Sequence, residues 1–423
     1  MAVAVAPACG DDSGPPIDTG SGLTFATGQG NGDTQDGAES DPPGPSSGAS
    51  DPTGGESVDS SGTEGSGEAC PENPCENEGT CTLVNEQPEC TCTREYWGQT
   101  CEHPRFVGTI FQGNDQALAI DETGTAWTWE IDDMPSMLEP VAGLVEVVSN
   151  PEHVTANRTR MGLDNQGEVW TWSGLEITPA QQDQLPPIAA MSTSEYYALF
   201  AAQDGGLWQT HYHDGVQSMD EPADVRRVFI GTTDLALTAD GTVWRRPNAS
   251  LTMAMPPWEQ LDFVPPDIIE VSTTMIDGPS HFLALDASGT VWAWGANEFG
   301  QLGSGSPSLD PVEDPVMVEG LSNVVDVGAG DGFSMALVDD GTVWAWGYGA
   351  DGQLGDGIAE DDHSRWLPHQ VLNITDAVAI STGDDRGLAL LGNGSVVQWG
   401  HGQFSADFPT PSLVPLPPVA AVP

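Results

Sequence analysis

Alternating apolar and polar positions recur along most of this 423-residue chain and predict short β-strands. In one copy, Phe282-Leu-Ala-Leu is followed by the turn residues Asp286-Ala-Ser-Gly289 and then by Thr290-Val-Trp-Ala-Trp294. Period-two alternation on both sides of a Gly/Asp/Ser cluster predicts an antiparallel hairpin. The glycine supplies a backbone position that can adopt positive φ, as a tight turn requires.

This hairpin pattern occurs seven times, and two copies are nearly identical: Phe282 to Gly295 and Phe333 to Gly347. The turn glycine recurs at intervals of 36 to 53 residues, at Gly124, Gly167, Gly205, Gly241, Gly289, Gly341 and Gly394. A period of this size is typical of solenoids, propellers or arrays.

Each repeat also contains strands before and after the hairpin. An apolar strand opens the unit in Leu144-Val-Glu-Val147, Ile268-Ile-Glu-Val271, Val324-Val-Asp-Val327 and Ala377-Val-Ala-Ile380, and a proline-marked strand such as Pro315-Val-Met-Val318 closes it. Three or four short antiparallel strands with no amphipathic helix between them describe a propeller blade. The sequence therefore predicts an all-β, seven-bladed β-propeller over residues 103–423, closed by a strand near Leu413-Val-Pro-Leu416.

Tryptophans mark two positions of the third strand. Eleven of the fourteen lie there: Trp127, Trp129, Trp170, Trp172, Trp208, Trp244, Trp292, Trp294, Trp344, Trp346 and Trp399. A large side chain that recurs at one blade position is expected to pack between blades rather than to stack on a ligand. Only Trp258 and Trp366 of the propeller stand outside these positions as candidate loop aromatics.

Two copies continue into a longer motif, Trp294-Gly-Ala-Asn-Glu-Phe-Gly-Gln-Leu-Gly303 and Trp346-Gly-Tyr-Gly-Ala-Asp-Gly-Gln-Leu-Gly355. This motif resembles the signature of the regulator of chromosome condensation repeat family, whose known members are seven-bladed propellers. Other copies depart from it, with Thr210 and Arg246 in place of the second tryptophan and Val397 in place of the first. The resemblance covers roughly residues 105–423.

Six cysteines precede the propeller with the spacing C-x4-C-x5-C-x8-C-x-C-x8-C, which alone allows fifteen pairings. The segment, residues 70–102, is similar to an EGF-like module, and this resemblance implies the disulfides Cys70–Cys81, Cys75–Cys90 and Cys92–Cys101. A module of this size needs such bridges because its core is small. No CxxC pair supports a zinc site, and no metal or other cofactor is expected.

The first residues, Ala2-Val-Ala-Val-Ala-Pro-Ala-Cys9, resemble the end of a bacterial lipoprotein signal peptide, which implies lipidation of Cys9. We expect residues 1–9 to be a signal remnant and residues 10–69, rich in Gly, Ser, Pro, Asp and Glu, to be a disordered acidic linker. Disulfides of this density predict an extracytoplasmic protein, a bacterial envelope lipoprotein or a secreted protein. The alternative is that Cys9 is an incidental cysteine and the linker an unstructured leader.

The formal net charge is −54, and every basic residue is an arginine. Such a chain is not expected to bind nucleic acid, which requires a basic surface. The charge favours basic proteins or divalent cations as partners, or serves solubility alone. Membrane contact is expected only through a lipid anchor, and the chain is expected to be a monomer.

Catalytic motifs are weak. His211-Tyr-His213-Asp214 places two imidazoles on one face of a strand but has no third ligand, and the acidic pairs Asp339-Asp340, Asp361-Asp362 and Asp384-Asp385 are predicted loop residues. The Asp-Gly-Thr-Val-Trp run can mimic a sialidase Asp-box, although its aspartate spacing drifts. We therefore predict no catalytic residues and a non-enzymatic, surface-anchored binding or adhesion protein that recognises a protein or glycan. The alternatives are a secreted inhibitor of an envelope enzyme, a propeller hydrolase or lyase, and the nucleotide-exchange role that the resemblance brings.

Overall fold

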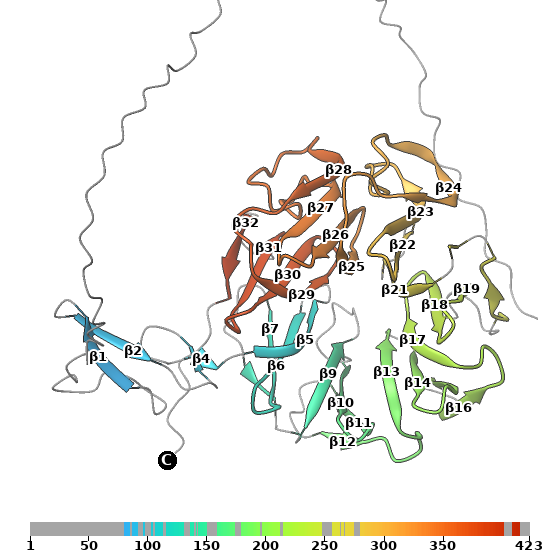
Figure 1. Cartoon of the computed structure of the whole chain (residues 1–423). Helices are drawn as coiled ribbons and strands as arrows, with labels where there is room; N and C mark the ends of the chain where they lie inside the picture. Colours follow the sequence, from blue (N-terminus) through green and yellow to red (C-terminus); the bar gives the residue numbers. More distant parts are fainter. Residues whose placement is uncertain are drawn as a thin grey trace, which may run out of the picture. The chain divides into compact units, whose positions relative to one another are not determined.

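The computed structural model of the chain forms a ring of seven four-stranded sheets (Figure 1). The structure describes residues 80–84, 87–91, 96–97, 103–104 and 106–414, apart from gaps at 113–115, 131–135, 139–140, 142, 150–158, 174–178, 195–196, 212–214, 248–255, 263, 266, 275–279 and 402–407. Among these residues, no helix is long and apolar enough to cross a membrane. The all-β, seven-bladed propeller that the sequence predicts is confirmed.

Each blade consists of four consecutive strands in sequence order, paired antiparallel. The first four blades are β5 (Phe106–Gln112), β6 (Gln116–Asp121), β7 (Ala126–Glu130) and β8 (Ser136–Met137); β9 (Leu144–Ser149), β10 (Thr159–Asp164), β11 (Val169–Ser173) and β12 (Ala180–Gln181); β13 (Ile188–Thr193), β14 (Tyr197–Ala202), β15 (Leu207–His211) and β16 (Gly215–Met219); β17 (Val225–Phe229), β18 (Thr233–Thr238), β19 (Val243–Pro247) and β20 (Glu259–Gln260). The last three are β21 (Ile268–Thr273), β22 (His281–Asp286), β23 (Val291–Asn297) and β24 (Ser308–Met317); β25 (Val324–Ala329), β26 (Phe333–Val338), β27 (Val343–Tyr348) and β28 (Ser364–Gln370); β29 (Ala377–Thr382), β30 (Arg386–Leu391), β31 (Val396–Gly400) and β32 (Phe408–Leu413).

The hairpin turns between the second and third strands owe their shape to a glycine and an acceptor side chain, which is an aspartate in six blades and Asn393 in the seventh. In the fifth blade, Asp286 Oδ1 accepts the backbone N–H groups of Ser288 at 2.9 Å and Thr290 at 3.1 Å. Its Oδ2 accepts the indole N–H of Trp292 at 3.0 Å. All seven aligned glycines adopt φ between +80° and +86°, a region that residues with a Cβ rarely occupy. The turn thus also positions the first tryptophan of the motif.

The second tryptophan of the motif joins one blade to the preceding one. Trp346 donates its indole N–H to the backbone carbonyl of Gln301 at 2.8 Å, and Trp399 donates to that of Gln353 at 2.9 Å. Leu302, beside Gln301, is fully buried in the core cluster that also contains Trp346. The Gly-Gln-Leu-Gly motif is therefore a blade-to-blade contact.

The eleven aligned tryptophans serve packing in both positions. Trp127, Trp129, Trp172, Trp294, Trp346 and Trp399 are buried, and Trp170, Trp208, Trp244, Trp292 and Trp344 are half-buried. Each of the seven core clusters contains residues of two neighbouring blades, so most of the apolar core lies between sheets.

The ring closes by side-chain packing of the seventh blade on the first. Phe106 and Trp129 share a core cluster with Leu388 and Val396, and the Phe106 N–H donates to the Gly394 carbonyl at 2.9 Å. The strand expected near Leu413–Leu416 lies earlier, at β32, and pairs with β31 as the outer strand of the seventh blade. No strand is therefore shared between the first and last blades among the described residues.

The fourth blade replaces the second tryptophan by a buried ion pair. Arg246 and Asp234 are directly opposite each other on β19 and β18, and both are 0% exposed. Arg246 Nε donates to Asp234 Oδ2 at 2.8 Å, and the Tyr197 hydroxyl donates to the same carboxylate at 2.6 Å. The Trp258 ring lies 4.7 Å from the guanidinium carbon. Trp258, just before β20, is thus buried and not an exposed aromatic, whereas Trp366 on β28 is half exposed.

Upstream of the propeller, the structure describes two small strand pairs. β1 (Thr80–Val84) pairs with β2 (Gln87–Thr91) in a register that places Cys81 opposite Cys90, and β3 (Tyr96–Trp97) pairs with β4 (His103–Pro104). The expected lipidated Cys9, the linker 10–69 and Cys70, Cys75, Cys92 and Cys101 lie outside the described residues. The EGF-like pairing therefore stays a prediction.

Candidate functional site

The inner strands of the seven blades, β5, β9, β13, β17, β21, β25 and β29, surround a central channel. We number the residues of each inner strand from β9 to β29 from its first residue, so that Leu144 is residue one and Ser149 is residue six; β17 has five residues. Residue five of every blade lines the channel, together with Phe111 of the first blade: Val148, Ser192, Phe229, Ser272, Gly328 and Ser381. The channel is therefore built from the same position of each repeat.

A β-bulge at residue two shapes each of these six strands. In β21, Ile268 pairs with Asp286 and Glu270 pairs with Leu285, so Ile269 has no partner across the ladder. The same shift occurs in β9, β13, β17, β25 and β29. A bulge redirects the side chains next to it. As a result, residues one and four are both buried and residue three is available to the channel.

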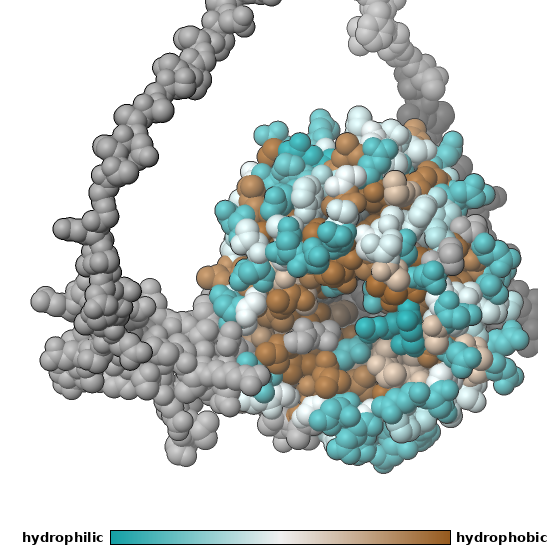
Figure 2. Space-filling view, in the orientation of Figure 1, coloured by the Kyte–Doolittle hydropathy of each residue, from teal (hydrophilic) through white to brown (hydrophobic). Residues whose placement is uncertain are grey.

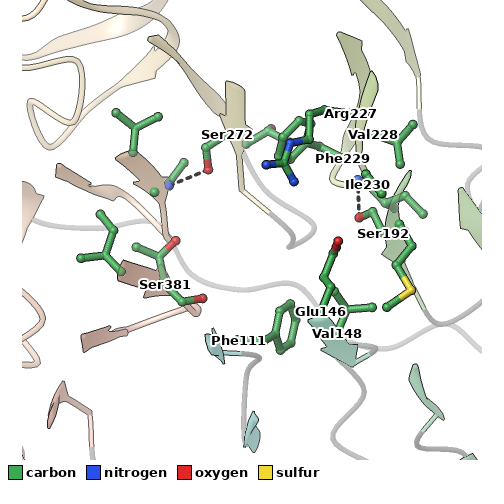
Figure 3. A pocket seen from close by; sticks show the side chains of 18 residues that line it. Phe111, Glu146, Val148, Ser192, Arg227, Val228, Phe229, Ile230, Ser272 and Ser381 are labelled. Carbon is green, nitrogen blue, oxygen red and sulfur yellow. Dashed lines mark hydrogen bonds between the residues drawn. The ribbon is translucent and has the colours of Figure 1, made fainter. Parts of the chain in front are cut away.

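Residue three carries the charge of the channel. It is Glu146 in β9, Arg227 in β17, Glu270 in β21 and Asp326 in β25. Arg227 Nε lies 3.8 Å from Glu270 Oε2. Figure 3 shows Glu146 and Arg227 directed from different blades toward the open middle of the ring. Three carboxylates and one arginine thus occupy the same position of their strands, and Glu146 and Asp326 both interact electrostatically with Arg227 and Glu270.

Two of the carboxylates also connect neighbouring inner strands. Glu146 accepts a hydrogen bond from the backbone of Met191 in the next blade, and Asp326 accepts one from the backbone of Ile380. These bonds satisfy backbone donors at the channel wall. The carboxylates consequently have a structural role in addition to any binding role.

The channel wall changes the acidity of these groups. Burial raises the pKa of the Glu146 carboxyl to about 7, although the Arg227 charge lowers it. Burial, and then the charge of Glu270, raise the pKa of Asp326 to about 7. Burial likewise raises the pKa of Glu270, against the lowering effect of Arg227. Such shifts arise because desolvation and like charges both disfavour the ionised form.

The channel holds a cavity of about 200 Å³ with a mixed lining, to which Glu146 and Arg227 contribute the charged groups. Phe111 and Phe229 contribute aromatic rings, and the Ser192 and Ser272 hydroxyls accept backbone N–H groups of Ile230 and Ala329, both at 3.0 Å (Figure 3). The Thr273 hydroxyl is buried, with the residue 7% exposed, and has no hydrogen-bond partner. It is an unsatisfied polar group in the wall of a cavity.

A serine and a histidine also meet in this part of the ring, but their geometry is not that of a nucleophile and its base. His281 Nε2 lies 2.8 Å from Ser334 Oγ, and both residues are fully buried. Ser334 donates its proton to the Gln301 carbonyl at 2.8 Å, so the imidazole must donate to Ser334. Burial lowers the pKa of His281 to about 3. The pair is a neutral structural contact.

The other candidate residues of the sequence lie apart from the channel. The seven glycines and the tryptophans of the repeat lie in hairpin turns and between blades. Of the histidine motif, His211 ends β15, and His213 and Asp214 lie outside the described residues. Among the described residues, no group of three or more His, Cys, Asp and Glu residues could hold a metal ion. The channel residues Glu146, Arg227, Glu270 and Asp326 were not among the sequence candidates.

Comparison with known proteins identifies the repeat. Residues 288–337 and 340–390 match the model of the Regulator of chromosome condensation (RCC1) repeat, and residues 271–301 and 324–353 match a second model of that repeat. Each of the longer segments begins in the hairpin turn of one blade and ends on the second strand of the next. Residues 271–390 of the seven-bladed propeller therefore carry RCC1 repeats.

Individual relatives share parts of this chain. It is 29% identical over 236 residues to the E3 ubiquitin-protein ligase HERC2 of Homo sapiens, a match that covers 52% of this chain and 5% of HERC2. It is 35% identical over 273 residues to the RCC1 domain-containing protein RUG3, mitochondrial, of Arabidopsis thaliana, covering 51% of this chain and 60% of RUG3. The crystal structure of human WBSCR16 superposes with a TM-score of 0.55 at 19% identity, covering 68% of this chain and 86% of that one, which shows the shared fold.

Proposed function

We propose that this chain is a non-enzymatic binding protein anchored at the surface of a bacterial envelope, where its propeller recognises a protein or glycan. The observation that carries the proposal is the central channel, which combines carboxylates, hydroxyls and aromatic rings in one rigid ring of strands. Binding sites are concave and contain a few polar groups in a largely apolar wall. The Ser334–His281 pair is fully buried, and Ser334 donates its proton to a backbone carbonyl, so this pair does not support a hydrolytic role.

The anchoring part of the proposal rests on the sequence upstream of the propeller. The sequence contains, in order, a cysteine after small residues, an acidic linker and a cysteine-rich segment. This order suits a tether that holds a binding domain away from a membrane. A lipid on Cys9 is the anchor in this proposal. In the same proposal, the EGF-like module with its three disulfides is the spacer between the linker and the propeller.

Two experiments test this setting. The protein produced in a bacterial host should incorporate labelled palmitate and partition into detergent, and Cys9→Ala should abolish both. Mass mapping without reduction should find Cys70–Cys81, Cys75–Cys90 and Cys92–Cys101, with Cys9 outside this set. A protein found in the cytosol with reduced cysteines would contradict the anchoring proposal.

A further inference from the structure

We propose that one mouth of the propeller channel binds a peptide segment of a partner protein by inserting a lysine or arginine side chain between Glu146 and Asp326. The apolar neighbours of that basic residue would pack on a ring of exposed aliphatic side chains around the mouth. This inference rests on the proposed binding function and assigns its ligand class.

The apolar ring follows from the bulges. The bulge shifts the register of the ladder at residue two of the inner strand, which lies next to the residues that carry the channel charge. In four blades this residue is a branched aliphatic between 41% and 58% exposed: Val145, Ile269, Val325 and Val378. Because the blades are arranged around one axis, equivalent residues encircle the channel. On the face that Figure 2 draws, apolar surface borders the hollow at the centre of the ring.

The charges inside this ring favour a cationic occupant. Arg227 is already near Glu270, and Arg226 Nη2 donates to the Ile268 carbonyl at 2.6 Å. Among the described residues, neither Glu146 nor Asp326 has a cationic group within 4.0 Å. Three carboxylates therefore face two arginines that have other contacts. A partly desolvated carboxylate attracts a cation more strongly than an exposed one does, because the local dielectric constant is lower.

The cavity that Glu146 and Arg227 help to line has room for one long side chain. Its volume of about 200 Å³ is below the roughly 300 Å³ at which pockets for drug-sized ligands begin. The unpartnered Thr273 oxygen in its wall can accept a hydrogen bond from an ammonium or guanidinium group. An acidic side chain would meet carboxylate repulsion, and a neutral one would leave the carboxylates uncompensated. Size, charge and the free acceptor thus select lysine or arginine.

Affinity should rise with pH. Glu146 on β9 faces Arg227 on β17 and Glu270 on β21, and Asp326 on β25 faces the same two groups. The occupant needs the ionised carboxylates, which form as pH rises through about 7. An inserted cation favours ionisation, so binding at pH 7 should release protons.

The test uses two labelled peptides and the full chain. The probes are fluorescein-Gly-Leu-Val-Lys-Val-Leu-Gly-amide and the same peptide with glutamine in place of lysine, measured by fluorescence anisotropy at pH 8 and low salt. The lysine peptide should bind at least tenfold more tightly. Equal affinities, or tighter binding of the glutamine peptide, would overturn the proposal.

Matched variants locate the binding. Glu146→Gln with Asp326→Asn should remove the lysine preference, whereas Asp361→Asn with Asp362→Asn, an equal charge change at exposed loop residues, should preserve it. If the first pair prevents folding, Val325→Ser with Val378→Ser, both on the exposed ring, should weaken both peptides by the same factor. A lysine preference that survives in the channel variant, or is lost equally in the loop variant, would show that the site lies elsewhere.

Failure of this site and failure of the proposed function give different results. Envelope proteins retained equally by the wild-type chain and by Glu146→Gln/Asp326→Asn would refute the channel site and leave the binding function intact. Lysine-selective peptide binding by a chain that remains in the cytosol would support the site and refute the envelope setting.

Discussion

The buried ion pair of the fourth blade makes a quantitative prediction for stability. Arg246→Met removes the cation and leaves the Asp234 carboxylate at 0% exposure with the Tyr197 hydroxyl as its remaining side-chain donor among the described residues. Breaking a buried pair at one partner costs about 3–5 kcal/mol because an uncompensated charge remains. With an unfolding entropy of about 2.1 cal/mol/K per residue over this propeller, a loss of about 4 kcal/mol lowers Tm by roughly 6 °C.

Differential scanning calorimetry at pH 8 measures this loss, and the neighbouring arginine supplies the control. Arg245 lies 3.5 Å from Glu259, and both side chains are about half exposed. Arg245→Met should therefore cost at most about 1 kcal/mol. Asp234→Ser with Arg246→Trp copies the opposed pair Ser334 and Trp346 of the sixth blade and should recover much of the loss.

The pH dependence of the single variant provides a second check. Burial raises the pKa of Asp234 to about 6, and Arg246 and Tyr197 lower it. Without Arg246 the carboxyl should be protonated at a higher pH still, so the penalty should shrink as pH falls from 8 to 6. If Arg246→Met changes Tm by no more than Arg245→Met at pH 8, the argument from the buried charge is wrong.

Two further predictions concern the channel and the repeat motif. Because their pKa values are raised in the folded protein, Glu146 and Asp326 bind more protons in the folded than in the unfolded state. Each group should therefore lower the free energy of unfolding by roughly 1 kcal/mol as the pH rises from 6 to 8. Urea titrations should show that Glu146→Gln/Asp326→Asn removes this slope, and an unchanged slope would contradict the assigned shifts. Gly303→Ala should destabilise by about 1–3 kcal/mol, because the new Cβ would lie 2.8 Å from Val318 Cγ1 at φ +65°. Gly320→Ala, with φ +83° and nothing within 4 Å, should cost less, and equal costs would show that backbone strain alone decides.

The architecture could be predicted from the sequence because its signals are local and repeated. The alternation of apolar and polar residues around each turn glycine predicts the hairpins, and the seven copies of this pattern predict the seven-bladed ring. The replacement of a tryptophan by Arg246 was visible, but its partner Asp234 was not, because that pairing depends on strand register. Trp258 was grouped with Trp366 for the same reason, since it precedes β20, and only the pairing of β20 with β19 brings it to Arg246.

The channel site was missed although its residues were part of a recognised pattern. Leu144-Val-Glu-Val147, Ile268-Ile-Glu-Val271 and Val324-Val-Asp-Val327 were interpreted as apolar opening strands. An acidic residue at the third place of all three was the available signal. The bulge directs this residue toward the channel and changes the spacing of the buried side chains from two residues to three. A search for strict alternation of apolar and polar residues therefore cannot detect it.

Photo-crosslinking tests the channel site most directly. The lysine peptide would carry a photoreactive leucine analogue next to its lysine, and the adducts on the full chain would be located by mass spectrometry after cleavage at acidic residues. The account predicts adducts within residues 144–149, 268–273 and 324–329, with loss of these adducts in Glu146→Gln/Asp326→Asn. Adducts concentrated instead in residues 348–363, or unchanged in the channel variant, would contradict it.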